Sequence, residues 1–267
     1  MKKIKRYARL YKVFVAQFFK FLVQSKADFL IGLLGFFLTQ ATGIAFLYLV
    51  FQQIPSLADW SLNQLIFIYG FAQIPRGIDH LFTDNIWLVA WRLIVNGQFD
   101  RYMLRPMNLF FQVICEKLQP DALGELLVGI ILIVSSLSKG IVLVDAVHIV
   151  FFVISILAGA LIYTAIKLLF ASLAFWMKIS GPVLYTAYQL ADFAKYPTEI
   201  YARGVRFVIN WVIPFAFVAY LPASYFLKTD VSPLGTIGVE CILSVVFFAV
   251  AYYVFHRGTK AYESCGN

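Results

Sequence analysis

The sequence predicts an all-α membrane protein with six transmembrane helices, and three observations support this fold class. Of the 267 residues, 61% are hydrophobic and 13% are charged, whereas soluble domains have about 45–50% and about 25%. The mean hydropathy is strongly positive. The apolar residues are grouped in runs long enough to cross a hydrocarbon core of about 30 Å. These values exclude a soluble globular protein, a disordered chain and a small disulfide scaffold, and they favour one membrane domain over residues 1–267.

Residues 1–27 are expected to form a basic amphipathic helix that lies on the membrane and is retained, because the compact apolar core of a cleaved signal peptide is missing. At about 100° per residue, apolar and basic side chains fall on opposite sides. The apolar side carries Ile4, Tyr7, Tyr11, Phe14, Phe18 and Phe21, and the basic side carries Lys5, Arg9, Lys12 and Lys20. Such a helix binds an anionic leaflet. A docking face for a cytosolic partner is compatible with this interpretation, and a simple orientation signal is the alternative.

Four spans are predicted before the last third of the chain. They cover about residues 28–51, 62–82, 108–137 and 145–177. The second span carries Pro75 and Arg76 in its last third, and only the second half of the third span is purely apolar. The fourth span is long enough to project beyond the bilayer.

The last third of the chain allows two interpretations before a final span at about 236–255. In the first, residues 180–201 cross outward, and the stretch broken by Pro214 and Pro222 dips back as a re-entrant hairpin. In the second, residues 178–206 are cytoplasmic and 207–227 form the fifth span. Non-helical backbone at membrane depth persists only where protein or a cavity covers it. Both interpretations give six spans with both termini on one side.

The distribution of basic residues predicts that both termini are cytoplasmic. The net charge is +8, and the Lys and Arg residues concentrate at the N-terminus and between apolar runs, where orientation signals lie. They do not predict a nucleic-acid partner. With the re-entrant hairpin, fifteen Lys and Arg residues fall on the side of the termini and five on the other. The second interpretation moves three more basic residues inside, so the charge rule mildly favours it.

Motifs for nucleotide, metal or nucleophile chemistry are missing from the sequence. It contains no phosphate-binding Gly-x-x-x-x-Gly-Lys-Ser/Thr loop, no His-Glu-x-x-His zinc pair and no Gly-x-Ser-x-Gly elbow. Cys115, Cys241 and Cys265 do not have metal-ligand spacing, and their odd number argues against a disulfide framework. We therefore expect no cofactor, no metal and no enzymatic activity in this chain.

Charged residues inside predicted spans are candidates for function. Lys167 lies ten residues before Met177, so its stem is expected to extend to the inner interface and place the ammonium group in water. Arg76 is expected to pair with Asp79 at i+3. In both cases the charge would be satisfied locally.

Four charged residues gather in the first half of the third span, which is expected to line the inner mouth of the protein. Lys117 and Asp121 have i, i+4 spacing and are expected to pair. Glu116 and Glu125 then need water or other partners. A proton-coupled carrier could use these acids, but a proton relay would need them spread across the membrane rather than crowded at one end.

The predicted cytoplasmic loop over residues 84–107 is the most informative segment. Its first part forms an amphipathic helix that carries Trp87, Trp91, Leu93 and Ile94. Its second part reads Gly97-Gln98-Phe99-Asp100-Arg101-Tyr102-Met103-Leu104-Arg105-Pro106. A glycine, an exposed phenylalanine and an Asp/Arg pattern between two spans are typical of a short helix that docks into another protein.

This second part resembles the Gly-x-Phe-Asp-x-x-Leu-Leu-Arg-Pro motif of a subfamily of ABC-2 type permeases, the six-span membrane subunits of ATP-binding cassette exporters. Met103 replaces the first Leu of that motif. Residues 196–201, Tyr-Pro-Thr-Glu-Ile-Tyr, together with Pro214 and Pro222, are similar to the family's Pro-rich stretch. The resemblance covers essentially the whole chain. In the wider family this stretch is a re-entrant hairpin on the outer side, which we therefore expect over residues 195–230.

The resemblance implies a half-transporter, in which two identical or paired membrane subunits sit on two ATPase subunits. A helix within residues 86–105 would couple the two parts. The residues expected at this contact are Trp91, Gly97, Phe99, Asp100 and Arg105. The first, second and fifth spans would line the substrate pathway, with the polar candidates Thr39, Gln40, Thr42, Gln73, Tyr185 and Gln189. Polar residues also hold helices together, which is the simpler alternative for these six.

We therefore expect the permease subunit of an ABC exporter, located in the cell membrane among lipids, with its ATPase in separate subunits. The alternative is a proton- or sodium-coupled secondary transporter that uses Glu116, Asp121, Glu125 and Lys167. An intramembrane enzyme built on His80 or His148 is a third class. Co-purification separates the first two classes, because only the permease should bring an ATPase with it.

Overall fold

A computed structural model of the chain describes residues 9–13, 15–16, 20, 26–142, 144–228 and 230–264. These residues form helices joined by short loops, and among them no strand is present, which confirms the all-α class. The predicted surface helix over residues 1–27 falls largely outside the described residues. Of residues 1–25, the structure describes 9–13, 15–16 and 20, and these are helical.

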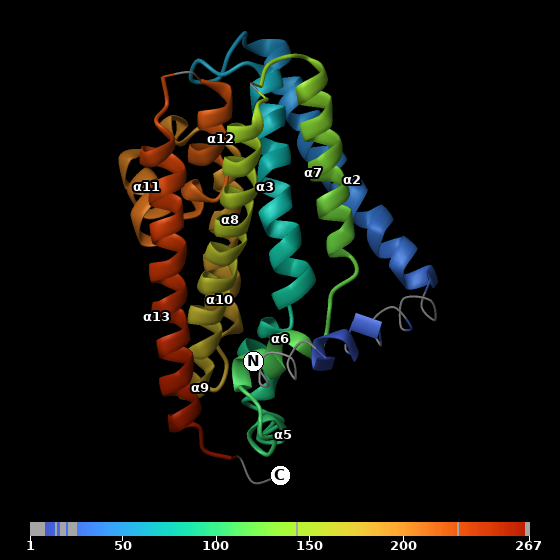
Figure 1. The fold of residues 1–267 in the computed structure, drawn as a ribbon, viewed down its shortest axis with the longest axis vertical. Helices are drawn as coiled ribbons and strands as arrows, with labels where there is room; N and C mark the ends of the chain where they lie inside the picture. The colour runs from blue at the N-terminus through green and yellow to red at the C-terminus, as the bar shows by residue number, and fades with distance from the viewer. Residues whose placement is uncertain are drawn as a thin grey trace.

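The long helices among the described residues run along the long axis of the molecule (Figure 1). They are α2 (Lys26–Gln53), α3 (Leu62–Thr83), α7 (Ala122–Ser138), α8 (Ala146–Ser172) and α13 (Val239–Ala261). We call the end that carries the C-terminus in Figure 1 the lower end, and the opposite end the upper end. α2 and α7 lead the chain to the upper end, and α3, α8 and α13 lead it back.

Among the described residues, three helices are long and apolar enough to cross a membrane, at residues 29–53, 146–177 and 234–261. A bent pair at residues 203–212 and 215–227 is a fourth candidate, and α7 is a shorter apolar helix. The predicted third span is not continuous, because α6 (Leu109–Cys115) ends well before α7 begins at Ala122. Pro120 accounts for this break, since a proline disfavours the helical conformation of the residue before it.

α3 lies at the centre of the bundle and packs along α7, α8 and α12 (Tyr220–Leu227). Small residues let α3 and α7 approach closely. A Cβ on Gly70 would lie 2.7 Å from Leu132 Cβ, and a Cβ on Gly129 would lie 3.0 Å from the carbonyl oxygen of Gly70. α13 packs along α8 on the other side. α2 is peripheral, since among its described side chains only Gln40 and Leu47 are buried.

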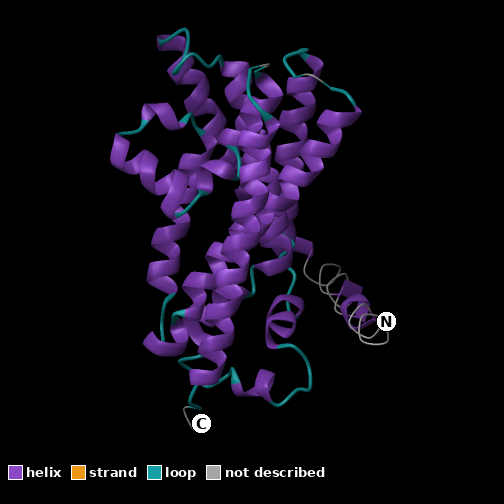
Figure 2. Cartoon of the chain, turned by 60° about the vertical axis from the view of Figure 1, so that its left-hand side comes forward, coloured by secondary structure: helices purple, strands orange, loops and turns teal. Residues whose placement is uncertain are grey.

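The segment between α8 and α13 is a series of short helices. It begins with α9 (Ala174–Met177), α10 (Gly181–Gln189) and the 3-10 helices η2 (Leu190–Lys195) and η3 (Thr198–Ile200). It continues with α11 (Arg203–Phe207), η4 (Val208–Val212), η5 (Phe215–Phe217) and α12, and η6 (Leu234–Gly238) then leads into α13. The helix axes bend by 67° where Pro214 interrupts them, and Figure 2 shows the bend in the upper half of the molecule.

Candidate functional site

The segment 84–107 forms a lobe at the lower end, built from α4 (Ile86–Leu88), the π-helix η1 (Val89–Leu93) and α5 (Asp100–Met103). Gly97, with φ of +65°, turns the chain between η1 and α5. The amide of Phe99 then donates to the carbonyl oxygen of Leu93 at 2.9 Å. A residue with a side chain would be strained at Gly97, so this glycine serves the fold of the lobe.

Phe99 is fully buried, so the expected exposed phenylalanine is a wrong prediction. Its ring centroid lies 5.1 Å from that of Phe175 in α9 and 5.4 Å from that of Tyr262, just beyond α13. The tight turn at Gly97 folds Phe99 inward against α9 and the C-terminal tail. Phe99 is therefore the apolar anchor of the lobe and lies behind its surface.

Polar side chains fix the lobe to the rest of the lower end. Asn85 Nδ2 donates to the carbonyl oxygen of Val113 at 2.7 Å. Gln112 Nε2 donates to the carbonyl oxygen of Tyr102 at 3.0 Å, and the Tyr102 hydroxyl donates to Glu116. Burial, reinforced by the hydrogen bond to Glu116, raises the pKa of Tyr102 to about 12. The predicted need of Glu116 for a partner is thus met by Tyr102, and by Arg101 at 2.7 Å.

The exposed tip of the lobe combines apolar and basic side chains. Leu104 is 85% exposed, and Arg101, Met103 and Arg105 are exposed beside it. Of the five residues predicted to contact an ATPase, the structure exposes Arg105 and Trp91. The Trp91 ring also lies directly against Gly181 of α10.

Asp100, another of those five residues, is half-buried and accepts a hydrogen bond from Ser264 at 2.5 Å. Gly97 forms the turn and Phe99 lies in the core. Met103 and Leu104, which sequence reasoning passed over, carry the most exposed apolar surface of the tip. They occupy the positions of the Leu-Leu pair of the motif, where Leu104 matches and Met103 replaces the first Leu, and this was the signal for them.

A buried ion pair joins α3 to α8. Lys167 Nζ lies 2.7 Å from Asp79 Oδ2, and both side chains are 0% exposed. Lys167 therefore does not extend to water, and that prediction is wrong. The carboxylate of Asp79 also accepts hydrogen bonds from Tyr188 at 2.5 Å, Thr83 at 2.6 Å and Thr164 at 2.9 Å. An ion pair removed from water needs such additional hydrogen bonds to be stable, and here three helices supply them.

Arg76 takes part in a second ionic chain. Its Nη1 lies 3.0 Å from Asp192 Oδ1, and its Nε lies 3.6 Å from Glu125 Oε1. Lys195 Nζ lies 2.8 Å from the same Asp192 oxygen, and His80 Nδ1 lies 2.9 Å from Glu125 Oε1. The predicted Arg76–Asp79 pair is wrong, because Asp79 contacts α8 and α10 while Arg76 contacts α7 and η2.

The two groups of charges together tie the central helices to each other, and Lys167 Nζ also lies 3.7 Å from Asp84 Oδ1. Lys167 offsets Asp79, and Arg76 with Lys195 offset Glu125 with Asp192. Within the described part of the chain, no group of His, Cys, Asp or Glu could hold a metal ion. The arrangement is suited to holding helices in register.

The predicted Lys117–Asp121 pair is not formed, since no ion pair joins these two described residues. Asp121 Oδ2 instead accepts from Gln119 Nε2 at 3.3 Å, and the carboxylate lies beside Gly32 of α2. The chain is not helical between α6 and α7, so the i, i+4 spacing does not bring the two side chains together. The predicted need of Glu125 for a partner is met by His80 and Arg76.

The six predicted pathway residues do not form one site. Gln40 Oε1 accepts from the Tyr69 hydroxyl at 2.6 Å, and the Tyr69 ring lies 5.1 Å from Lys195 Nζ, so Gln40 joins the second ionic chain. Gln73 is fully buried, and its amide has no hydrogen-bond partner among the described residues. The hydroxyls of Thr39 and Thr42 donate to carbonyl oxygens of their own helix.

Tyr185 and Gln189 are exposed on α10, and Asp192 of η2 continues the same exposed stripe, with 51% of its side chain exposed. Sequence reasoning missed Asp192, Lys195 and the buried Glu240, whose Oε2 accepts from Ser155 at 2.5 Å. Asp192 and Lys195 lie at the end of a segment that is only marginally apolar for a membrane span. Charged residues in such a segment were the signal that could have identified them.

A family model described as ABC-2 family transporter protein matches residues 37–266. No curated protein and no solved structure matches the chain. The match covers most of the sequence, including the central bundle and the lobe. It agrees with the resemblance of the 97–106 segment and with the apolar helices long enough to span a bilayer. The chain therefore belongs to the ABC-2 transporter family and is a multi-pass membrane permease.

Proposed function

We propose that this chain is the membrane subunit of an ABC exporter, and that separate ATPase subunits dock on the tip of the lobe. The observation that supports this proposal most directly is the exposure of the tip. Leu104 is 85% exposed there and lies beside the exposed residues Arg101, Met103 and Arg105. Met103 and Leu104 place two exposed apolar side chains next to each other, and an exposed apolar patch rimmed by polar residues marks a protein contact. Because Phe99 and Gln112 anchor the lobe from behind, a push on the tip is transmitted to the bundle.

The proposed orientation places the lower end and both termini in the cytoplasm. The excess of Lys and Arg on that side supports it. In this topology α2, α3, α7, α8, the segment from α10 to α12, and α13 are the six spans. The 67° bend at Pro214 supports a re-entrant hairpin that reaches back from the outer side.

A second permease subunit, identical or paired, would complete the pathway along the face where α2 and α10 are exposed. Two observations support this face. Most of the surface of α2 is not covered by the rest of the chain. The stripe of Tyr185, Gln189 and Asp192 on α10 and η2 is polar, and exposure of polar groups to lipid is costly. The partner subunit would shield this stripe from lipid.

We propose that energy for transport comes from ATP rather than from a proton gradient, because two acids at the centre of the bundle, Asp79 and Glu125, are held by cations. Asp79 is bound to Lys167 and three hydroxyls, and Glu125 is bound to Arg76 and His80. A carrier would need an acid that binds and releases protons during transport. The ion pairs with Lys167 and Arg76 oppose that exchange.

Affinity purification from native membranes tests the proposal. The tagged full chain should bring down a protein with a phosphate-binding loop. Leu104→Asp places a charge at the tip and should remove this protein. Gln98→Asp, which adds the same charge at another exposed position of the lobe, should retain it. Retention of the ATPase by both variants would contradict the proposed docking site, and transport by the isolated chain with a pH gradient alone would contradict the exporter.

A further inference from the structure

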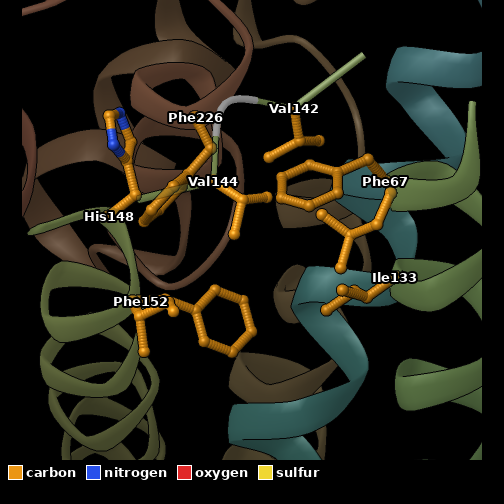
Figure 3. Close-up of a pocket in the computed structure, with 9 residues that line it drawn as sticks. Phe67, Ile133, Val142, Val144, His148, Phe152 and Phe226 are labelled. Atoms are coloured by element: carbon orange, nitrogen blue, oxygen red, sulfur yellow. The ribbon is translucent and has the colours of Figure 1, made fainter. Parts of the chain in front are cut away.

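An apolar cavity of about 130 Å³ lies at the upper end of the bundle, between α7 and α8. Both helices pack along α3, and the cavity lies beside the first turns of α3, where Phe67 lines it. Phe67 of α3, Ile133 of α7, Phe152 of α8 and Phe226 of α12 line its walls, as Figure 3 shows. The cavity thus lies where four elements meet without filling the space between them.

The walls offer almost nothing to a water molecule. His148 is the one polar residue among those that line the cavity. Its Nδ1 lies 2.8 Å from Asp145 Oδ1, and its ring stacks on Tyr225 with centroids 5.2 Å apart. A buried water typically needs two to four polar partners, and this site provides at most the remaining ring nitrogen. The cavity is therefore a site for hydrocarbon.

The mouth of the cavity opens sideways onto aliphatic surface. Leu137, Val144 and Ile149 line the cavity and are also exposed. Val147 and Val150, close by on α8, are more than half exposed. In a membrane protein, such a continuous aliphatic surface faces lipid. The cavity is thus continuous with the lipid-facing surface of the protein.

The depth of the cavity matches the acyl region of the leaflet on the upper side. Phe67 is the sixth residue of α3 and Phe152 the seventh of α8, so both lie about 8–9 Å along the helices at 1.5 Å per residue. Hydrocarbon chains are the apolar groups available at this depth. A cavity of about 150 Å³ with apolar walls accommodates a benzene molecule, so this one accommodates a short segment of a single chain.

We propose that this cavity binds an acyl chain of a bilayer phospholipid. The acyl chain would enter between α7 and α8 past Ile149. Inside the cavity it would contact Phe67 of α3 and Phe226 of α12. Unfilled, these side chains lose dispersion contacts on one side. Bound lipid would therefore link α12, the second half of the bent pair, to α7 and α8. This site is independent of the proposed ATPase contact at the opposite end.

Photolabelling tests the site with the full-length protein in nanodiscs. The probe is a phosphatidylcholine that carries a diazirine in the half of one acyl chain nearest the headgroup. Labelled residues are mapped by peptide mass spectrometry. Phe67 and Phe226 line the cavity and are only 1% and 3% exposed, so an acyl chain labels them only if it enters the cavity and moves the surrounding side chains apart. Labelling of these two residues is the expected result. Labelling confined to exposed positions such as Ile149 and Val150 would overturn the proposal.

Variants that fill the cavity provide a second test of the proposal. Ile133→Phe enlarges a wall residue and should abolish labelling of Phe67 and Phe226. The matched control Ile131→Phe changes an exposed position on the same helix and should leave the labelling intact. If Ile133→Phe does not fold, Leu137→Phe narrows the mouth and should have the same effect. Undiminished labelling of Phe67 in a folded cavity-filling variant would also overturn the proposal.

Discussion

The ammonium group of Lys167 in α8 lies 2.7 Å from the carboxylate of Asp79 in α3, and neither side chain is exposed. Tyr188 of α10 completes the contact through its hydroxyl, 2.5 Å from the same carboxylate oxygen. α8 and α10 thus both meet α3, which lies far before them in the sequence, at one buried carboxylate. Since an unpaired charge is very costly at this depth, the pair fixes how α3, α8 and α10 sit together.

Lys167→Met is expected to lower the free energy of unfolding by about 3–5 kcal/mol, because it leaves the carboxylate of Asp79 buried without its cation. The double variant Lys167→Met/Asp79→Leu should lose less than the sum of the two single variants. Unfolding in mixed micelles measures these values. Lys139→Met, at an exposed lysine that donates to Asn63, is the control and should have little effect. Additive losses in the double variant would show that the pair is not coupled.

Asp192→Asn is expected to loosen η2 from α3 with little change in overall stability. Half of the Asp192 side chain is exposed, and exposed ion pairs contribute about 0–1 kcal/mol. Hydrogen exchange of residues 190–195 should therefore accelerate while the unfolding midpoint stays nearly constant. The exposed neighbour Gln189, changed to Asn, should leave exchange unaltered. Unchanged exchange in the Asp192 variant would mean that the ionic chain does not hold η2.

Phe99→Ala and Leu104→Ala should have opposite consequences, although both residues belong to the same motif. Phe99 is buried, and its truncation should cost about 3–5 kcal/mol through the cavity it leaves. Leu104 is exposed, and its truncation should spare stability and weaken only the ATPase contact. Thermal unfolding and co-purification separate these effects. A stable Phe99→Ala variant that loses the ATPase would restore a direct docking role for Phe99.

The lobe is expected to keep its internal bonds up to strongly alkaline pH. The pKa of Tyr102 is raised to about 12, by burial first and then by the bond to Glu116. For a group with a raised pKa in the folded state, its stabilising effect is complete below the usual value of about 10 and is lost as pH rises through about 12. The phenolate absorbance of the wild type minus that of Tyr102→Phe should titrate well above pH 10. A difference that titrates at or below that value would contradict the buried position.

The sequence predicted the helical class, the family, the extents of α2 and α3 to within two residues, and the apolar helix over residues 146–177, whereas the last helix extends to Ala261, beyond the predicted end at about residue 255. Hydropathy and the length of an apolar run depend only on local composition. Predictions based on them therefore do not require knowing which residues each side chain contacts. The break between α6 and α7 was missed because hydropathy ignores the local effect of Pro120.

The site was harder to predict, because its contacts join distant residues. Lys167 was expected to reach water because its distance to Met177 is visible in sequence, whereas Asp79, 88 positions away, is brought to it only by the packing of α3 on α8. Phe99 was expected to be exposed because nothing local shows that Phe175 and Tyr262 cover it. Ion pairs between helices depend on helix rotation, which composition does not specify.

The most direct test of the central claim is photo-crosslinking from the tip of the lobe in native membranes. Benzoylphenylalanine at position 104 should form an adduct with a protein that carries a phosphate-binding loop, because Leu104 is the most exposed apolar side chain of the tip. The same group at position 57, in the loop at the upper end, should form none. Adducts of position 104 with lipid alone, or with the ATPase from position 57 instead, would contradict the proposed docking of an ATPase on this lobe.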